Sequence, residues 1–178
     1  MKIKLFTVPN IITLCNLLCG CGSIVASLVF CNFSLAFLLI IASAVCDFFD
    51  GFTARLLRQY SDIGVQLDSL ADMVSFGVAP SAIMYLFASQ TFTMFNLPSA
   101  VVAVLTFVPF LMAAFSALRL AKFNIDDTQH ESFEGLPTPA NAVFCASFVY
   151  AVVTVGKAVS LEWVALIYVL MSALLVST

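Results

Sequence analysis

The sequence has few charged residues: lysine, arginine, aspartate and glutamate make up 10% of its 178 positions. A soluble domain carries roughly 25%. Here 62% of the residues are hydrophobic, and the mean hydropathy is +1.10. The chain is therefore expected to be a membrane protein. At about 20 residues for each crossing, its length allows six helices with short loops and leaves no room for a separate soluble domain.

A basic tail, metal-binding cysteine pairs and a cleavage site are also lacking. The net charge is −3 and there is no basic tail, so nucleic acid is not an expected partner. The six cysteines form no C-x2-C pair, and we interpret them as small apolar side chains within the membrane. The N-terminus has no small-residue cleavage site. We therefore expect it to be retained, with Lys2 to Val8 lying along the membrane surface.

Long hydrophobic segments, separated by polar or helix-breaking residues, predict an all-α polytopic membrane protein with six transmembrane helices. Pro80 and Pro109 fall inside the third and fourth segments and are expected to kink those helices. We interpret the whole chain, residues 1–178, as one membrane domain. The predicted spans lie near residues 9–30, 34–58, 66–89, 99–121, 137–155 and 161–177.

The distribution of charge predicts the orientation of these spans. Only Lys157 falls on one side of the membrane, and the other six basic residues fall on the opposite side. The positive-inside rule then places both termini in the cytoplasm. Nine of the ten acidic residues lie on or near that same side, so polar chemistry is expected at the cytoplasmic face of the cell membrane. The six basic residues are Lys2, Lys4, Arg55, Arg58, Arg119 and Lys122.

Four aspartates stand out against this apolar background. An aspartate at the centre of a membrane helix costs about 2.5–3.5 kcal/mol, so four of them need a shared compensating charge. Spacings of three and four residues place each pair on one helix face, and two facing helices would bring the four carboxylates together. Mg²⁺ and Mn²⁺ prefer such an all-oxygen site. The pattern is Asp47-x2-Asp50-Gly51-x2-Ala54-Arg55-x8-Gly64-x3-Asp68-x3-Asp72.

The aspartates admit two other interpretations. In a buried salt-bridge network, Arg55 would have to neutralise four carboxylates, and Arg58 is the only other cation in these two predicted helices. A proton or cation pathway through a transporter is the alternative from another class, because membrane carboxylates often serve that purpose. However, these four lie near one face. Gly51 and Ala54 let a ligand approach the backbone, and a guanidinium at Arg55 suits a phosphate. A diphosphate site is therefore favoured.

The spacing resembles the signature of the CDP-alcohol phosphotransferase family, and every fixed residue of that signature is present. The resemblance implies an enzyme with two divalent ions. Asp47 and Asp68 would bridge both ions, while Asp50 and Asp72 would each complete one. Asp72 would also be the general base that deprotonates an acceptor alcohol. The implied reaction is attack by that alcohol on the lipid-linked phosphorus of a CDP-linked lipid, with release of CMP.

The same resemblance indicates where the CDP-linked lipid would bind. In the family, the start of the first span looks like part of this pocket, which indicates Asn10 and Thr13 here. Ser61 resembles a further position that contacts the nucleotide and phosphate. The expected CDP-lipid-binding residues are Asn10, Thr13, Gly51, Ala54, Arg55 and Ser61.

Two other segments, 116–124 and 133–141, are similar to segments of the phosphatidylserine synthases in this family. They imply CDP-diacylglycerol as donor and L-serine as acceptor. Members of the family are typically homodimers in contact with membrane lipids, so the family resemblance also implies a homodimer here. Arg119 is the best partner for the serine carboxylate because its fork is bidentate; Lys122 and Asn124 are further candidates. A phosphorylated acceptor would call for more basic residues near the site. Another family member, such as a phosphatidylglycerophosphate synthase, is the alternative within the class.

Overall fold

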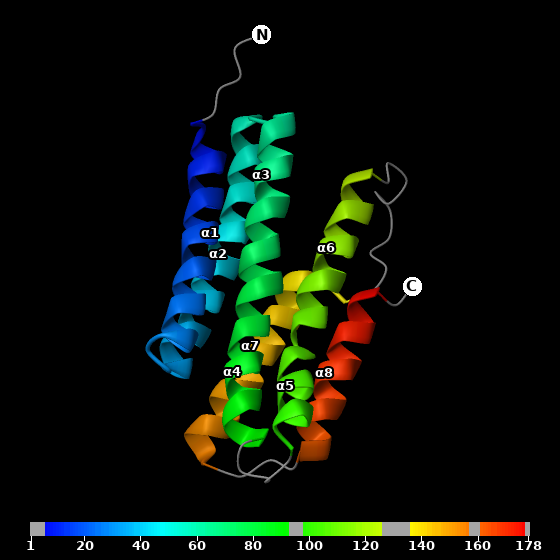
Figure 1. Cartoon of the computed structure of the whole chain (residues 1–178). Coiled ribbons are helices and arrows are strands. Elements are labelled where there is room, and N and C mark those ends of the chain that lie inside the picture. Colours follow the sequence, from blue (N-terminus) through cyan, green and yellow to red (C-terminus); the bar gives the residue numbers. More distant parts are fainter. Residues whose placement is uncertain (1–5, 93–97, 126–135, 157–160, 177–178) are drawn as a thin grey trace.

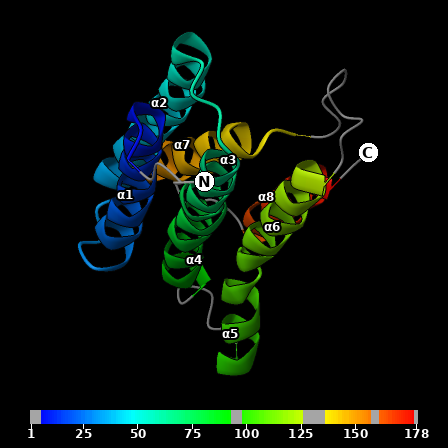
Figure 2. The ribbon, with the colours of Figure 1, turned by 90° about the horizontal axis from the view of Figure 1, so that it is seen from above.

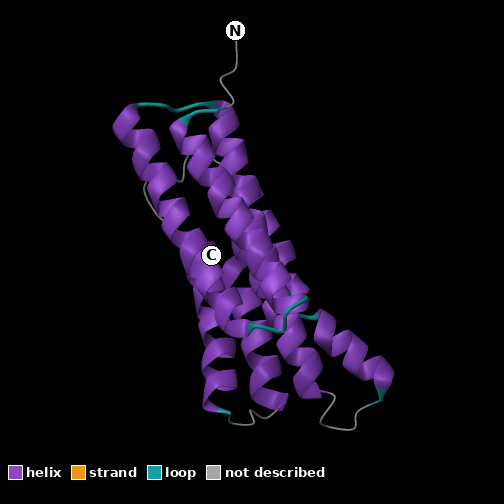
Figure 3. Cartoon of the chain, turned by 90° about the vertical axis from the view of Figure 1, so that its left-hand side faces the viewer, coloured by secondary structure: helices purple, strands orange, loops and turns teal. Residues whose placement is uncertain are grey.

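The computed structural model describes residues 6–92, 98–125, 136–156 and 161–176. Within this part of the chain every regular element is a helix (Figure 3). The elements are α1 (Val8–Leu28), α2 (Phe33–Leu57), α3 (Asp62–Asp72), the π-helical segment η1 (Met73–Val78), α4 (Ala79–Phe92), α5 (Ser99–Phe107), α6 (Phe110–Ile125), α7 (Thr138–Val155) and α8 (Leu161–Val176).

Five helical stretches are long and apolar enough to cross a membrane, by length and composition. They correspond to the first five predicted spans, and they make the chain an integral membrane protein. The sixth predicted span corresponds to α8, whose 16 residues fall short of the roughly 20 that a crossing normally requires. The sixth crossing therefore stays a prediction. The five stretches are Val8–Leu28, Phe33–Leu57, Asp62–Thr91, Ser99–Asn124 and Thr138–Val155.

A continuous helix made of α3, η1 and α4 runs through the middle of the molecule. Figure 2 shows it between the α1–α2 pair and the helix formed by α5 and α6. In this central helix 61% of the most apolar window is buried, against 22–33% in the other four candidate spans. The surrounding helices therefore leave much of their apolar surface exposed, as expected for helices that contact lipid.

A side chain caps the N-terminus of each of the two helices that carry the four aspartates, α2 and α3. The Asn32 side chain accepts a hydrogen bond from a backbone N–H at the start of α2, at 2.9 Å. Ser61 does the same for the Gly64 N–H at 3.1 Å. Because Ser61 caps α3, the helix begins at Asp62. The loop after α2 is thus shorter than the predicted segment 59–65.

The two prolines inside predicted spans behave differently. The fourth candidate span is interrupted between α5 and α6 at Val108 and Pro109, where the kink was predicted. At Pro80 the helix continues without a break, and the irregularity lies just before it, in the six residues of η1. In such a segment the hydrogen bonds run from residue i to residue i+5. Pro80 has no N–H to donate to the Phe76 carbonyl within η1, but the sequence alone does not specify a π-helix.

The hydrophobic core lies where the central helix meets α2, α6 and α7. In Figure 1, α7 and α8 lie beside the half of the bundle that is remote from the start of α1. The opposite half is formed by α1, α2, α3 and the end of α6. The largest fully buried apolar side chains are Ile40, Phe76, Ile83, Met84, Met112 and Val149.

The start of α1, the end of α2 and the start of α3 lie at one end of the bundle, and α6 runs toward that end (Figure 1). Arg55 on α2 and Arg58 directly after it therefore share this end with the last turns of α6, which carry Arg119 and Lys122. The predicted N-in/C-in orientation stays a prediction. Of the segments it used, residues 1–5, 126–135 and 157–160 lie outside the described part of the chain, and so does most of the predicted interfacial segment.

Candidate active site

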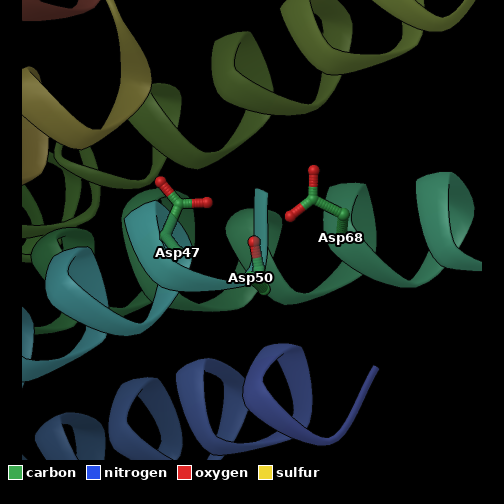
Figure 4. Close-up of side chains that lie close together, drawn as sticks. All are labelled: Asp47, Asp50 and Asp68. Carbon is green, nitrogen blue, oxygen red and sulfur yellow. The ribbon is translucent and has the colours of Figure 1, made fainter. Parts of the chain in front are cut away.

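Three carboxylates meet between α2 and α3. Asp47 and Asp50 come from α2, and Asp68 comes from α3. Each contributes an oxygen atom that lies within 4.8 Å of the other two. Figure 4 shows Asp47 and Asp68 on either side of Asp50. Oxygens this close together can share one cation.

The donor atoms of this cluster fit a hard divalent ion. Asp50 is only 5% exposed. Its Oδ2 atom and the Oδ1 atom of Asp68 are buried and have no hydrogen-bond partner within the described part of the chain. A buried polar atom without a partner is costly. Coordination of Mg²⁺ or Mn²⁺ would satisfy both oxygens and neutralise the repulsion among the carboxylates.

Asp72 lies one turn further along α3 and is 9% exposed. Its carboxylate lies next to that of Asp47. Its Oδ1 atom accepts a hydrogen bond from the Nδ2 atom of Asn16 on α1, at 3.2 Å. The predicted cluster of four is therefore one close group of three carboxylates with Asp72 beside it.

A cavity of about 260 Å³ leads to the carboxylates. It lies between the start of α1, the end of α2 and the start of α3, and Asp50 and Asp68 form part of its wall. All six residues predicted to bind a CDP-linked lipid line it: Asn10, Thr13, Gly51, Ala54, Arg55 and Ser61. Its wall also contains Pro9, Gln59, Tyr60, Gly64 and Val65, of which only Gly64 had been singled out in the sequence.

The two glycines in the cavity wall serve different purposes. A Cβ atom on Gly51 would meet only the Arg55 guanidinium, at 4.0 Å, so this position leaves space open. A Cβ atom on Gly64 would lie 3.1 Å from Ser61 Oγ and 3.2 Å from Asn10 Oδ1. Gly64 therefore lets the starts of α1 and α3 approach each other, which brings Asn10 and Ser61 to the same wall.

Arg55 brings a positive charge to the cavity. Its Nε atom donates to the carbonyl oxygen of Gly51, one turn earlier in α2, at 3.1 Å. This bond holds the side chain along the helix and beside the cavity. A guanidinium carries five N–H donors, and its planar fork matches a phosphate group.

The residues expected to bind the acceptor do not line this cavity. Arg119, Lys122 and Asn124 belong to α6, which lies on the other side of α3 from α1 and α2 (Figure 2). Arg119 is half-buried and Lys122 is exposed. Asn124 and Ser69 of α3 exchange two hydrogen bonds, at 2.9 and 3.1 Å. Because Ser69 follows Asp68, this pair ties the end of α6 to the helix that carries the cluster.

Sequence reasoning missed one polar group beside the aspartates. Asn16 is fully buried and contacts Asp72, although the two are 56 residues apart in the chain. Ser43 of α2 and Ser75 of η1 donate to Asn16 in turn. The only signal in the sequence is a polar amide inside an apolar span, where such groups usually have partners.

Comparisons with known proteins agree with this arrangement. The family model described as CDP-alcohol phosphatidyltransferase matches residues 6–175. The chain is 40% identical over 132 residues to the CDP-diacylglycerol–serine O-phosphatidyltransferase of Bacillus subtilis, an alignment that covers 74% of this chain and 69% of that protein. Proteins of the same name from Helicobacter pylori strain J99 and Methanocaldococcus jannaschii are 38% and 34% identical.

These alignments cover 78% and 82% of this chain, but only 55% of the Helicobacter protein and 61% of the Methanocaldococcus protein. The chain thus spans between about half and about two thirds of the length of these relatives. The family match itself extends over nearly the whole chain. It also includes the α2 and α3 residues that form the carboxylate cluster and the cavity wall. The family expected from the aspartate pattern is thereby confirmed: the chain belongs to the CDP-alcohol phosphatidyltransferase family.

Proposed function

We propose that this protein transfers the phosphatidyl group of CDP-diacylglycerol to the hydroxyl of L-serine, giving phosphatidylserine and CMP. The observation that carries the proposal is the cavity in which Asp50 and Asp68 share a wall with Arg55 and the start of α1. Relatives at 34–40% identity that bear this activity in their names support serine as the acceptor.

The donor would bind with its diphosphate beside Arg55 and the carboxylate cluster. Gly51 and Ala54 leave room for the phosphates along α2. Asn10, Thr13 and Ser61 would offer polar groups to the cytidine and its phosphate. The Ser61 hydroxyl accepts from the Gly64 N–H, and a hydroxyl that accepts one bond can still donate one.

Four aspartates, Asp47, Asp50, Asp68 and Asp72, would hold two Mg²⁺ or Mn²⁺ ions. Asp47 and Asp68 would bridge the ions, with Asp50 and Asp72 each completing one. When bound, such a pair supplies positive charge to the entering and leaving oxygens of a phosphoryl-group transfer. The buried, unpartnered oxygens of Asp50 and Asp68 support this assignment.

The remaining chemistry falls to the protein. The serine hydroxyl oxygen forms a bond to the phosphorus that carries the diacylglycerol, and Asp72 takes the hydroxyl proton. The bond between that phosphorus and the oxygen of CMP breaks, and CMP leaves with the electron pair. Arg119 would hold the serine carboxylate from the α6 side of α3, with Lys122 and Asn124 nearby.

The proposal includes the placement of the chain in the cell membrane. We infer six crossings with α8 as the sixth, one domain, both termini and the active site on the cytoplasmic side, and a homodimer. A fluorescent protein fused after Thr178 tests the orientation. It should fluoresce, because such a protein folds in the cytoplasm, where the C-terminus is expected. A periplasmic phosphatase fused at the same place should stay inactive. Active phosphatase would overturn the inferred orientation.

The acceptor is tested directly with purified protein in lipid nanodiscs. CDP-diacylglycerol is supplied with L-serine, glycerol 3-phosphate or inositol phosphate in turn, and CMP and the lipid product are measured. We expect release of CMP with serine, dependent on Mg²⁺ or Mn²⁺ and abolished by a chelator. Turnover with glycerol 3-phosphate instead would favour a phosphatidylglycerophosphate synthase. No CMP with any acceptor, together with cation flux in vesicles, would favour a transporter.

A further inference from the structure

We propose that Asn16 is a positioning residue that fixes the direction of the Asp72 carboxylate. This inference rests on the proposed function, in which Asp72 takes the proton of the acceptor. Asn16 lies on α1 and is fully buried. Its Nδ2 atom donates to Asp72 Oδ1 at 3.2 Å. A carboxylate turns freely about its Cβ–Cγ bond, and a donor held against one oxygen stops that rotation.

The Asn16 amide has a second hydrogen-bond partner besides Asp72, which helps to hold it in place. Ser43 on α2, also fully buried, donates its hydroxyl to Asn16 Oδ1. In its contact with Asn16, the Asp72 Oδ1 atom is the acceptor, as a carboxylate oxygen is. With a hydroxyl donor on one side and a carboxylate on the other, only one orientation of the amide satisfies both partners. The Asp72 carboxylate is therefore oriented by α2 through α1.

The backbone of Asn16 is held as firmly as its side chain. Its carbonyl oxygen accepts a hydrogen bond from Ser75 Oγ at 3.1 Å. Ser75 is fully buried in η1 and follows Asp72 by three residues. The segment that carries Asp72 thus contacts Asn16 at two points, once through the carboxylate and once through the Ser75 hydroxyl. Two contacts restrict how this segment can move relative to Asn16.

A glycine on α1 allows this close approach. Gly20 lies one turn after Asn16, and a Cβ atom there would be 2.7 Å from the Ser75 Cα atom. Such a contact with backbone is closer than side chains permit, so α1 can pack this tightly on η1 only with glycine at this position. A displacement of about 1 Å in an active site can cost roughly a hundredfold in rate, so this tight junction matters for the base.

The test compares two equally buried asparagines. Asn16 and Asn141 are both fully buried within candidate membrane helices, and the Asn141 amide lies 3.9 Å from the Met112 sulfur in the core. In Asn16→Ala we expect kcat to fall at least about tenfold, since the base is misdirected, with KM for serine and for CDP-diacylglycerol unchanged. Asn141→Ala should lower thermal stability and leave kcat as in the wild type.

A second readout does not depend on turnover. Binding of Mn²⁺, followed by electron paramagnetic resonance in detergent, should weaken in Asn16→Ala and stay unchanged in Asn141→Ala, because Asp72 is the expected ligand of one ion. If the wild type releases no CMP with any acceptor, the proposed function fails while this comparison still tests Asn16. Wild-type kcat and Mn²⁺ affinity in folded Asn16→Ala would overturn the inference, as would equal losses in Asn141→Ala.

A milder variant covers the case in which Asn16→Ala does not fold. Ser43→Ala keeps the Asn16 donor and removes only the group that orients it, so we expect a smaller loss of kcat, again without a change in KM. If Asn16→Ala does fold, adding Ser43→Ala to it should lower kcat no further, because the two act through one hydrogen-bonded chain. A wild-type kcat in Ser43→Ala, or additive losses in the double variant, would contradict this chain.

Discussion

At the scale of single residues, the aspartates differ in whether their carboxylate oxygens already have a hydrogen-bond partner in the protein. Asp72 has a protein donor in Asn16. One oxygen each of Asp50 and Asp68 is buried without a partner in the described residues. The first arrangement holds a carboxylate in one direction, and the second leaves oxygens that require a cation. The difference matches the further role of a base, which is proposed for Asp72 in addition to that of a metal ligand.

Asp68→Asn is expected to abolish CMP release and to weaken Mn²⁺ binding, because a bridging carboxylate loses a ligand charge to both ions. The measurement is CMP release as a function of Mn²⁺ concentration. Asp62→Asn is the control, since Asp62 is an exposed aspartate at the start of the same helix and lies outside the cavity wall. Near-normal turnover of Asp68→Asn at ordinary metal concentrations would remove Asp68 from the site.

Asp72→Asn should lose about 10²–10⁴-fold in turnover, the range for a positioned general base. CDP-diacylglycerol should still bind, because Arg55 and the rest of the cavity wall are intact. The measurements are kcat for CMP release and the Kd of the lipid donor. If the variant keeps more than about a tenth of the wild-type rate, the base role is excluded, because the loss of rate is then smaller than this range.

Arg119→Ala should raise the serine KM by about ten- to a hundredfold, which corresponds to one charge-assisted hydrogen bond of roughly 1.5–3 kcal/mol. The Kd of CDP-diacylglycerol should stay unchanged, because Arg119 does not line the cavity. Arg119→Lys separates binding from anchoring: it keeps the charge at the helix end but removes the bidentate fork. An unchanged serine KM in both folded variants would leave serine supported by the relatives alone.

At the scale of helices, features that depend on local sequence could be predicted, whereas contacts between residues far apart in the chain could not. The i, i+3 and i, i+4 spacing of the aspartates is a local property, and the structure places three of them together as that spacing predicts. The break at Pro109 follows from a missing N–H donor. The contact between Asn16 and Asp72 depends on how α1 packs on α3, which no local pattern determines. The η1 segment contains Gly77 and ends two residues before Pro80, but neither residue by itself specifies a π-helical segment.

The packing of α1 on η1 gives a prediction at this scale. Gly20→Ala should lower stability by about 1–3 kcal/mol through overpacking, because the new Cβ meets Ser75 backbone. Gly22→Ala is the matched control in the same helix. Its Cβ meets only the end of the flexible Leu39 side chain, at 3.3 Å. Thermal unfolding in detergent checks both variants. If Gly20→Ala is as stable as Gly22→Ala, then α1 and η1 can move apart enough to accommodate the new Cβ atom.

At the scale of the whole molecule, the polar site and the apolar core lie in different halves. The cavity is formed by the ends of α1, α2 and α3, whereas α7 and α8 pack beside the other half (Figure 1). The half that bears the cavity is therefore covered by fewer helices. This arrangement suits a donor whose head group must enter the protein while its acyl chains stay in the bilayer.

The unequal helix lengths have a consequence for the bilayer itself. The 16 residues of α8 rise about 24 Å and the 25 residues of α2 about 37 Å, against a hydrocarbon core about 30 Å thick. With α8 as the sixth crossing, lipid must thin along one flank of the protein and thicken, or α2 must tilt, along the other. We expect turnover and thermal stability in nanodiscs to fall as the acyl chains of the host lipid lengthen. A rate independent of chain length would argue against a membrane-crossing α8. If turnover does fall with chain length, bilayer thickness would regulate this enzyme without any dedicated regulatory site.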